Sequence, residues 1–392
     1  MQLVAMGAQD VYLTGNPQIT FFKVVYRRHT NFSKECIAQT FNGSVGFGSS
    51  VTCTLARNGD LVQEIYLRTK INCTVDTNGD IVRLDDVTSL IKTVEVEIGG
   101  QKIDKHYSQW LDIYNELFET SHDYRTVMNT GSGTVADKTN DVHAVTAYIP
   151  LRFWFNRNPG LALPLIALQY HEVKVNVTFG GASDLFSAHA DTAANLAALA
   201  SGASAAAATG TRAGVALSSA DLLVNYLYLD TDERRRFAQV SHEYLIEQVQ
   251  HTGVETAGGA IDMNFNHPVK ALLWSGASWE NVKLQLNGHD RAAEQPHDYY
   301  HLVQPYESGL GHSGKSLNTG TRAWATVAAG GDVGMYSFCL KPAEHQPSGT
   351  CNFSRIDNAR LNMAGSGSVW LFAMNYNVLR IMSGMGGLAY SN

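Results

Sequence analysis

Apolar and polar residues alternate with a period of two along much of this chain. Residues 94–98, 173–179 and 282–286 each place apolar side chains on one face and charged or amide side chains on the other. This alternation is typical of strands that bury one face. Gly99–Gly100 follows the first of these segments and Asn287–Gly288 follows the third, and both dipeptides favour tight hairpin turns. The pattern therefore predicts antiparallel sheets.

One segment departs from this pattern in favour of a helix. In SQWLDIYNELFET, which starts at Ser108, five large apolar residues recur at helical spacing. They are Trp110, Leu111, Tyr114, Leu117 and Phe118. Such a stripe usually packs into a protein core. We therefore expect one convincing helix in a chain that is otherwise built from strands.

The strand-like segments occur twice, in the same order. The first two pairs are displaced by about 208 residues and the last two by about 185 to 190, which is a repeat of domain size. The paired segments begin near Glu35 and Glu243, Leu55 and Met263, Val94 and Val282, and Leu151 and Tyr336. Each copy supplies about eight strands, the number that a jelly roll needs. The predicted fold is all-β, with two consecutive eight-stranded antiparallel jelly rolls.

The repeat divides the chain into three parts. We predict an N-terminal arm at residues 1–32, a first jelly-roll domain at residues 33–232 and a second at residues 233–392. The boundary falls in the segment Leu229–Gln239, whose run Arg234–Arg236 is expected to form a solvated linker. The alanine-rich residues 187–219 are of low complexity, and we expect a projecting loop there.

Composition limits the classes of function. The chain has 392 residues, of which 44% are hydrophobic and 17% charged, so it can build packed cores. Its net charge of −7 argues against a dedicated nucleic-acid-binding protein. The N-terminus lacks the pattern of a secretory signal and no run of about 18 apolar residues occurs, so we expect no membrane insertion. Five scattered cysteines, with no C-x-x-C pair, predict free thiols; they are Cys36, Cys53, Cys73, Cys339 and Cys351.

Side-chain patterns that carry catalytic chemistry are sparse. His297 and His301 have the H-x-x-x-H spacing that could chelate a metal from a helix. Pro296 and Pro305 bracket this pair and argue against a long helix there. Two carboxylate pairs, Asp85–Asp86 and Asp230/Asp232, stand in loop-like sequence. We therefore predict no catalytic, cofactor-binding or metal-binding residues.

The segment Gly309–Ser316, GLGHSGKS, matches the phosphate loop G-x-x-x-x-G-K-S and also the dinucleotide fingerprint G-x-G-x-x-G. Both motifs need a strand before them and a helix that starts within them. QPYES precedes the segment, and Asn318, Thr319 and Gly320 soon follow it, so neither requirement is met. We predict a connecting loop and no cofactor, with nucleotide binding through this segment kept as a weaker alternative.

Several longer blocks resemble the major capsid proteins of large nucleocytoplasmic DNA viruses, and most closely those of the chlorella-type algal viruses (phycodnaviruses). The blocks are residues 7–32, 42–48, 57–62, 98–107, 158–174, 242–248, 264–268, 341–359 and 375–390. The resemblance implies a structural protein of an icosahedral double-stranded DNA virus, assembled in the host cytoplasm and located in the virion. It also implies a homotrimer with a pseudo-hexagonal outline, a capsomer that contacts neighbouring capsomers to tile the shell.

The same resemblance implies that the arm lies on the inner side of the shell. There it would contact minor capsid proteins or neighbouring capsomers, through apolar residues such as Phe21, Phe22 and Tyr26 and basic residues such as Lys23 and Arg27. The alternative is an arm that packs on its own subunit.

Two connections of the second jelly roll, at residues 274–281 and 362–372, are shorter than family members often have, which leaves a compact paralogue open. A bicupin-like metal-dependent enzyme is the remaining alternative. It would need two or three His and a carboxylate that converge, and no such spacing occurs.

Overall fold

The computed structural model of this chain describes residues 7–74, 81–84, 87–118, 133–136, 142–182, 186–189, 215–276, 278–291, 293–310 and 333–390. Before residue 230 the strands are β1 (Phe32–Thr40), β2 (Ser50–Thr54), β3 (Leu61–Thr74), β4 (Ile81–Leu84), β5 (Ile91–Ile98), β6 (Gln101–Tyr107), β7 (Gly133–Ala136), β8 (Val142–Pro150), β9 (Leu163–Pro164), β10 (Val173–Phe179), β11 (Phe186–His189) and β12 (Val215–Leu229). After it they are β13 (His242–Thr256), β14 (Gly259–Asp262), β15 (Pro268–Ser275), β16 (Ser278–Leu286), β17 (His289–Asp290), β18 (Gln295–Pro296), β19 (Gly334–Ser337), β20 (Cys351–Asn352), β21 (Ala359–Ser366), β22 (Ser368–Met382) and β23 (Met385–Leu388). The helices are α1 (Asp10–Thr14), η1 (Val87–Leu90), α2 (Ser108–Leu117), α4 (Trp154–Arg157), η2 (Pro159–Leu161), α7 (Thr231–Gln239), η3 (Tyr299–Val303), α8 (Gln304–Glu307) and η4 (Phe353–Arg355).

The strands form two jelly rolls with the same strand order. In the first, the sheets run β1-β12-β3-β8 and β2-β10-β5-β6; in the second, they run β13-β22-β15-β19 and β14-β21-β16-β17. All of these pairings are antiparallel. The first strand of each copy pairs with a long strand near the end of that copy, β12 in the first and β22 in the second. The predicted repeat and the predicted double jelly roll are confirmed.

Alternating side chains build each core. On β5, Val94, Val96 and Ile98 are fully buried, whereas Glu95 and Glu97 on the opposite face are half-buried. Strand β10 buries every second residue in the same way. Both predictions from the period of two are confirmed.

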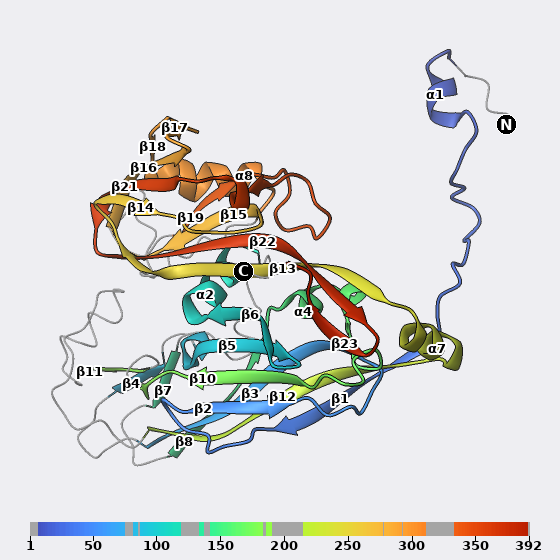
Figure 1. Cartoon of the computed structure of the whole chain (residues 1–392), viewed down its shortest axis with the longest axis horizontal. Helices are drawn as coiled ribbons and strands as arrows, with labels where there is room; N and C mark the ends of the chain where they lie inside the picture. Colours follow the sequence, from blue (N-terminus) through green and yellow to red (C-terminus); the bar gives the residue numbers. More distant parts are fainter. Residues whose placement is uncertain are drawn as a thin grey trace.

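The two jelly rolls are stacked and share part of one core (Figure 1). The sheet β13-β22-β15-β19 lies over β6 and α2 of the first jelly roll (Figure 1). Its residues Leu273, Phe372 and Met374 belong to the same buried cluster as Trp110 of α2. The predicted helix is therefore confirmed, and its stripe is core packing between the two jelly rolls.

The expectation of a single helix was wrong in two places. The first is the predicted linker, where α7 is helical because Asp230 caps it, its carboxylate accepting from the backbone N–H of Thr231. No residue of the helix is buried, and Arg234 pairs with Asp60 at 3.0 Å. The arginine run is therefore a solvated helix rather than an irregular linker.

The second place is the segment that follows β18. Helical turns begin at His297 and continue through η3 and α8 to Glu307. Pro296 ends β18 before the helix starts, and Pro305 stands within the helical segment, directly after the π-helical turn η3. A π-helical turn interrupts the regular i→i−4 hydrogen bonds, and an interior proline removes one of these bonds. The two prolines therefore do not prevent the helix, and the irregular turn η3 lies directly before the second of them.

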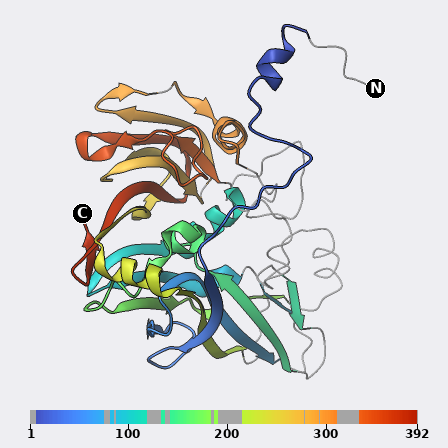
Figure 2. The ribbon, with the colours of Figure 1, turned by 90° about the vertical axis from the view of Figure 1, so that its right-hand side faces the viewer.

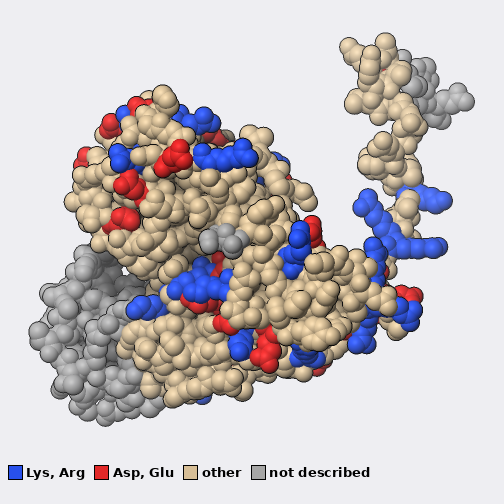
Figure 3. All heavy atoms as spheres, in the orientation of Figure 1, with Lys and Arg blue, Asp and Glu red and all other residues tan. Residues whose placement is uncertain are grey.

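The N-terminal arm leaves the body as an extended segment that ends in the short helix α1 (Figure 2). Its apolar side chains contact almost nothing: Phe22 is 98% exposed, and Phe21 and Tyr26 are nearly as open. Lysine and arginine gather where the arm joins the body (Figure 3). The alternative in which the arm packs on its own subunit is therefore wrong.

None of the helices in the described part of the chain is long and apolar enough to cross a bilayer.

The hairpin turn at Asn287–Gly288 offers a local test of the fold. Both residues have positive φ, at 52° and 76°, as the predicted turn requires. We expect Gly288→Ala to lower the free energy of unfolding by about 1 to 2 kcal/mol, because a side chain is strained in this conformation although the space around it is open. Chemical denaturation would measure the change. The control Gly46→Ala, at open space without positive φ, should leave stability unchanged or slightly higher.

Candidate functional site: the junction between the jelly rolls

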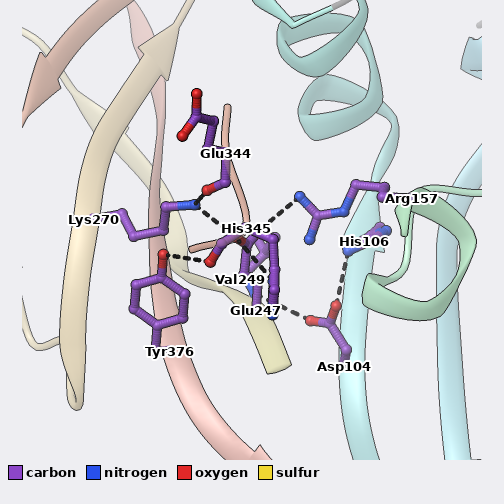
Figure 4. Close-up of polar contacts among 9 residues, drawn as sticks. All are labelled: Asp104, His106, Arg157, Glu247, Val249, Lys270, Glu344, His345 and Tyr376. Atoms are coloured by element: carbon purple, nitrogen blue, oxygen red, sulfur yellow. Dashed lines mark hydrogen bonds and ion pairs between the residues drawn. The ribbon is translucent and has the colours of Figure 1, made fainter. Parts of the chain in front are cut away.

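Three charged side chains meet where the two jelly rolls are joined (Figure 4). Glu247 comes from β13 and Lys270 from β15, both in the second jelly roll, whereas Arg157 ends α4 in the first. One carboxylate oxygen of Glu247 lies 2.6 Å from the Lys270 Nζ and the other lies 2.8 Å from an Arg157 Nη. Glu247 therefore links the two jelly rolls through a cation on each side.

The lysine of this cluster is buried to an unusual degree. Lys270 is 1% exposed, and its ammonium also donates to the carbonyl of Glu344 at 3.0 Å. The ring of Tyr376 lies 5.0 Å from the same Nζ. Because a buried ammonium without acceptors is very costly, these partners are what permit Lys270 to remain charged inside the protein.

The cluster favours the ionised form of Glu247. Burial alone raises the pKa of Glu247, but the positive charges of Arg157 and Lys270 more than offset burial, so that the pKa of Glu247 lies below its usual range. Burial lowers the pKa of Lys270, and the attraction of Glu247 offsets only part of that effect. His345 lies 3.8 Å from Glu247, and burial lowers the pKa of its imidazole.

Hydrogen bonds extend the junction along β6 and β13. The Asp104 carboxylate of β6 accepts from the backbone N–H of Val249 at 3.1 Å and lies 2.9 Å from His106 Nε2 (Figure 4). Gln248 donates to the carbonyl of Ile103 across the same junction. Buried polar groups with partners of this kind fix how two surfaces fit together. The arrangement is suited to holding two jelly rolls in one orientation.

A shallow cavity of about 230 Å³ opens beside these contacts, between β6 and β13. Three of the polar side chains that line it already have partners within the chain. Lys105 pairs with Glu95 at 2.7 Å, Gln250 donates to a backbone carbonyl at 2.7 Å, and His251 Nδ1 lies 2.8 Å from another. The cavity therefore offers little to a ligand.

The two histidines singled out in the sequence do come together. The rings of His297 and His301 lie 5.2 Å apart on the unexpected helix. His297 Nδ1 lies 3.3 Å from a carboxylate oxygen of Asp298, and His301 Nδ1 lies 2.8 Å from the carbonyl oxygen of Val333. Among the residues that the structure describes, no group of three or more His, Cys, Asp or Glu could hold a metal ion. Nothing here supports the bicupin-like alternative.

The other residues singled out in the sequence show no sign of a catalytic or binding site, or lie outside the described residues. Asp230 caps α7 and Asp232 stands in its first turn. Gly309 follows α8 with a φ of 68°, so the segment Gly309–Ser316 begins after a helix rather than after a strand. Residues 85–86 and 311–316 are not among the described ones. The thiols of Cys36, Cys53, Cys339 and Cys351 are free, and burial raises the pKa of Cys53 to about 11.

Comparison with known proteins shows what kind of protein carries this junction. A family model described as "Major capsid protein N-terminus" matches residues 20–230. A second, described as "Large eukaryotic DNA virus major capsid protein", matches residues 233–278 and 275–387. The chain belongs to the major capsid proteins of large eukaryotic DNA viruses.

Individual capsid proteins match over their whole length. The major capsid protein of Pyramimonas orientalis virus is 53% identical, with 100% of this chain and 99% of that protein covered. That of Paramecium bursaria Chlorella virus 1 is 41% identical with the same coverage. The structure of PBCV-1 VP54 matches with a TM-score of 0.73 at 36% identity, over 95% of this chain and 100% of that one. The resemblance seen in the sequence is confirmed, and the function is that of a structural capsid protein.

Sequence patterns did not reveal the junction of this capsid protein. Glu247 and Lys270 stand in strands that look like ordinary half-buried ones, and Arg157 is about 90 residues away from Glu247 along the chain. One signal was present: Lys270 interrupts the apolar run VKALLW, whose remaining residues are all buried. A lone lysine in a buried strand implies a carboxylate partner.

Proposed function

We propose that this capsid protein forms a homotrimeric, pseudo-hexagonal capsomer, which contacts neighbouring capsomers to tile an icosahedral shell. The observation that carries the proposal is the identical strand order of the two jelly rolls. Three chains then supply six similar units around one axis, and closed rings are the usual form of homo-oligomers. The likeness of this chain to a protein in a quasi-atomic model of the PBCV-1 virus capsid, at 36% identity, also supports a place in a shell.

The chain divides, in this proposal, into an arm at residues 1–32, a first jelly-roll domain at residues 33–232 and a second at residues 233–392. The four-stranded sheets support the division, because each draws its strands from one side of α7. The two family models also meet near this helix. The function needs no catalytic, cofactor-binding or metal-binding residue.

The arm serves contacts beneath the shell, with minor capsid proteins or neighbouring capsomers. Its exposed apolar side chains support this role, since contiguous apolar surface of this kind marks an interaction site. Assembly in the host cytoplasm is the corresponding location. Free thiols at the four described cysteines are consistent with a reducing compartment.

The role of the arm can be tested by cross-linking in intact virions. Lys23 is the only lysine before Lys34, so an amine-reactive cross-linker reports on the arm through one lysine. We expect mass spectrometry to find Lys23 linked to other virion proteins or to other capsomers. Cross-links from Lys23 that lead only to lysines of its own capsomer would contradict this role. Lys283, which lies far along the chain in the second jelly roll, serves as the internal comparison.

A further inference from the structure

Cationic side chains gather at the end of the molecule from which the arm leaves (Figure 3). Residues 11–34 contain four lysines and arginines and no aspartate or glutamate. The four are Lys23, Arg27, Arg28 and Lys34. Lys34 pairs with Glu64 at 2.7 Å, whereas the other three form no ion pair with any described residue. The arm is therefore a positively charged segment of a protein whose net charge is −7.

Apolar side chains are interleaved with these cations. Phe21 and Phe22 precede Lys23, and residues 24–26 separate it from Arg27. The apolar side chains of this stretch are all at least three-quarters exposed; they are Phe21, Phe22, Val24, Val25 and Tyr26. Since residues 15–31 form neither a helix nor a strand, no regular element covers this apolar surface. Exposed apolar surface of this extent marks a contact site.

Helix α7 lies beside the base of the arm. It begins two residues after Leu229, which lies opposite Phe32, the first residue after the arm, in the strand register. The helix carries Arg234–Arg236, and of these Arg234 pairs with Asp60. Its three arginines and two carboxylates leave it one positive charge. The positive charge of the arm therefore continues onto the body.

The turn between β22 and β23 adds apolar side chains beside the far end of α7. His242, which follows this helix closely, lies opposite Ile381 on β22. Met382 and Met385 close the turn as a pair in the register, and both are more than half exposed. We call residues 19–28, α7 and this turn the basic end. It combines unpaired cations with exposed apolar side chains.

We propose that the basic end binds the surface of an anionic bilayer. The lysine and arginine side chains of the arm contact phospholipid headgroups, and Phe21, Phe22 and Tyr26 enter the boundary between headgroups and acyl chains. Clusters of lysine and arginine attract anionic lipids, and aromatic rings are favoured at that boundary. The arm lies along the bilayer surface and does not cross it.

The aliphatic residues of the arm favour a bilayer over a nucleic acid as the partner. Single strands are bound through backbone charge and through stacking of bases on aromatic rings, to which Ile19, Val24 and Val25 contribute little. At a bilayer the same three side chains bury apolar area. The arm projects from the body (Figure 2), and exposed charges more than about 8 Å apart are largely screened at physiological ionic strength. The net negative charge of the body therefore opposes this binding little.

Vesicle flotation with the purified full-length protein tests the proposal. We expect the protein to float with vesicles of phosphatidylcholine and phosphatidylserine at low salt, and to be released as the salt concentration rises. It should not float with phosphatidylcholine alone. Absence of binding to the anionic vesicles, or equal binding to both kinds, would overturn the proposal. The inference goes beyond the protein contacts proposed for the arm, which the cross-links of Lys23 in virions test separately.

Removal of charge from the arm locates the contact. The triple variant Lys23→Ala/Arg27→Ala/Arg28→Ala should bind the anionic vesicles roughly 100-fold more weakly, because each cation near the surface adds to the attraction. The matched control removes the same charge from exposed positions outside the basic end, as Lys92→Ala/Arg355→Ala/Arg360→Ala. It should bind as the wild type does. Equal losses for the two triple variants would show that net charge alone acts and that the arm is not the contact.

The aromatic side chains are tested at constant charge. We expect Phe21→Ser/Phe22→Ser to weaken binding to the anionic vesicles by about tenfold, because two rings no longer leave water. Tyr170→Ser, which removes an exposed ring outside the basic end, should have no effect. Unchanged binding of the double variant would overturn the placement of the rings in the bilayer. Binding of single-stranded DNA that depends on Lys23, Arg27 and Arg28, without binding to vesicles, would make the arm a nucleic-acid contact and the proposal wrong.

Discussion

Replacing Glu247 by glutamine is expected to lower the free energy of unfolding by about 3 to 5 kcal/mol. The amide removes the only carboxylate that contacts both Arg157 and Lys270 among the described residues, and it leaves two cations close together at the junction. Breaking a buried pair on one side costs far more than its formation contributes, because the remaining charge keeps its burial penalty. Chemical denaturation, or the unfolding rate where refolding fails, would measure the loss.

The matched control for this variant is Glu243→Gln on the same strand. Glu243 pairs with Arg380 at 2.8 Å, but both side chains are more than half exposed. Exposed pairs contribute about 1 kcal/mol or less, so this variant should remain close to the wild type. Equal losses for the two variants would show that Glu247 does not stabilise the junction through its buried charge.

The same carboxylate predicts a dependence on pH. Because the pKa of Glu247 is lower in the folded protein than in the unfolded chain, its stabilisation is complete above the unfolded pKa. It is lost as the pH falls through the folded pKa, when the carboxylate takes up a proton. Stability of the wild type should therefore decline more steeply in acid than that of Glu247→Gln. Parallel curves for the two proteins would contradict this origin.

The second large effect is expected from Trp110→Ala, with a loss of about 3 to 5 kcal/mol. Trp110 is 1% exposed and packs between α2 and the second jelly roll, so its removal leaves a cavity in the shared core. Thermal and chemical unfolding, followed by tryptophan fluorescence and circular dichroism, would measure the change. Since the buried cluster around Trp110 includes residues of both jelly rolls, both probes should shift together.

Tyr170→Ala is the control for this variant, because it removes an aromatic ring that is largely exposed. A surface change of this kind should alter stability by no more than about 0.5 kcal/mol. If Trp110→Ala instead produced two separate transitions, with the second jelly roll unfolding at its wild-type position, the two jelly rolls would not share one cooperative core.

The fold was predictable from the sequence where local patterns agree with the final structure. Strand β5 shows this, since its alternation, its Gly99–Gly100 turn and its burial all correspond. The two helices that were not predicted lie where prolines, or a run of arginines, had been taken as evidence against a helix. Pro305 stands inside a helical segment, directly after the π-helical turn η3, and the cap at Asp230 begins a helix that contains the arginine run.

The junction was harder to predict because its residues are distant in the sequence. Arg157 meets Glu247 only when the second jelly roll is stacked on the first, and no local pattern encodes that stacking. The segment Gly309–Ser316 is the opposite case, in which a complete local motif stands in surroundings that do not fit it. Its sequence matches every position of the phosphate-loop motif. A helix precedes Gly309, however, where such a loop requires a strand.

The mass of the purified full-length protein shows directly whether this capsid protein forms trimers. A capsid protein that forms the proposed trimeric capsomer should give stable particles of three chains, each of 42.8 kDa, at micromolar concentration. Light scattering or native mass spectrometry would report that mass, and it should not change on tenfold dilution. A monomer that persists across this range of concentrations would contradict the proposed trimer.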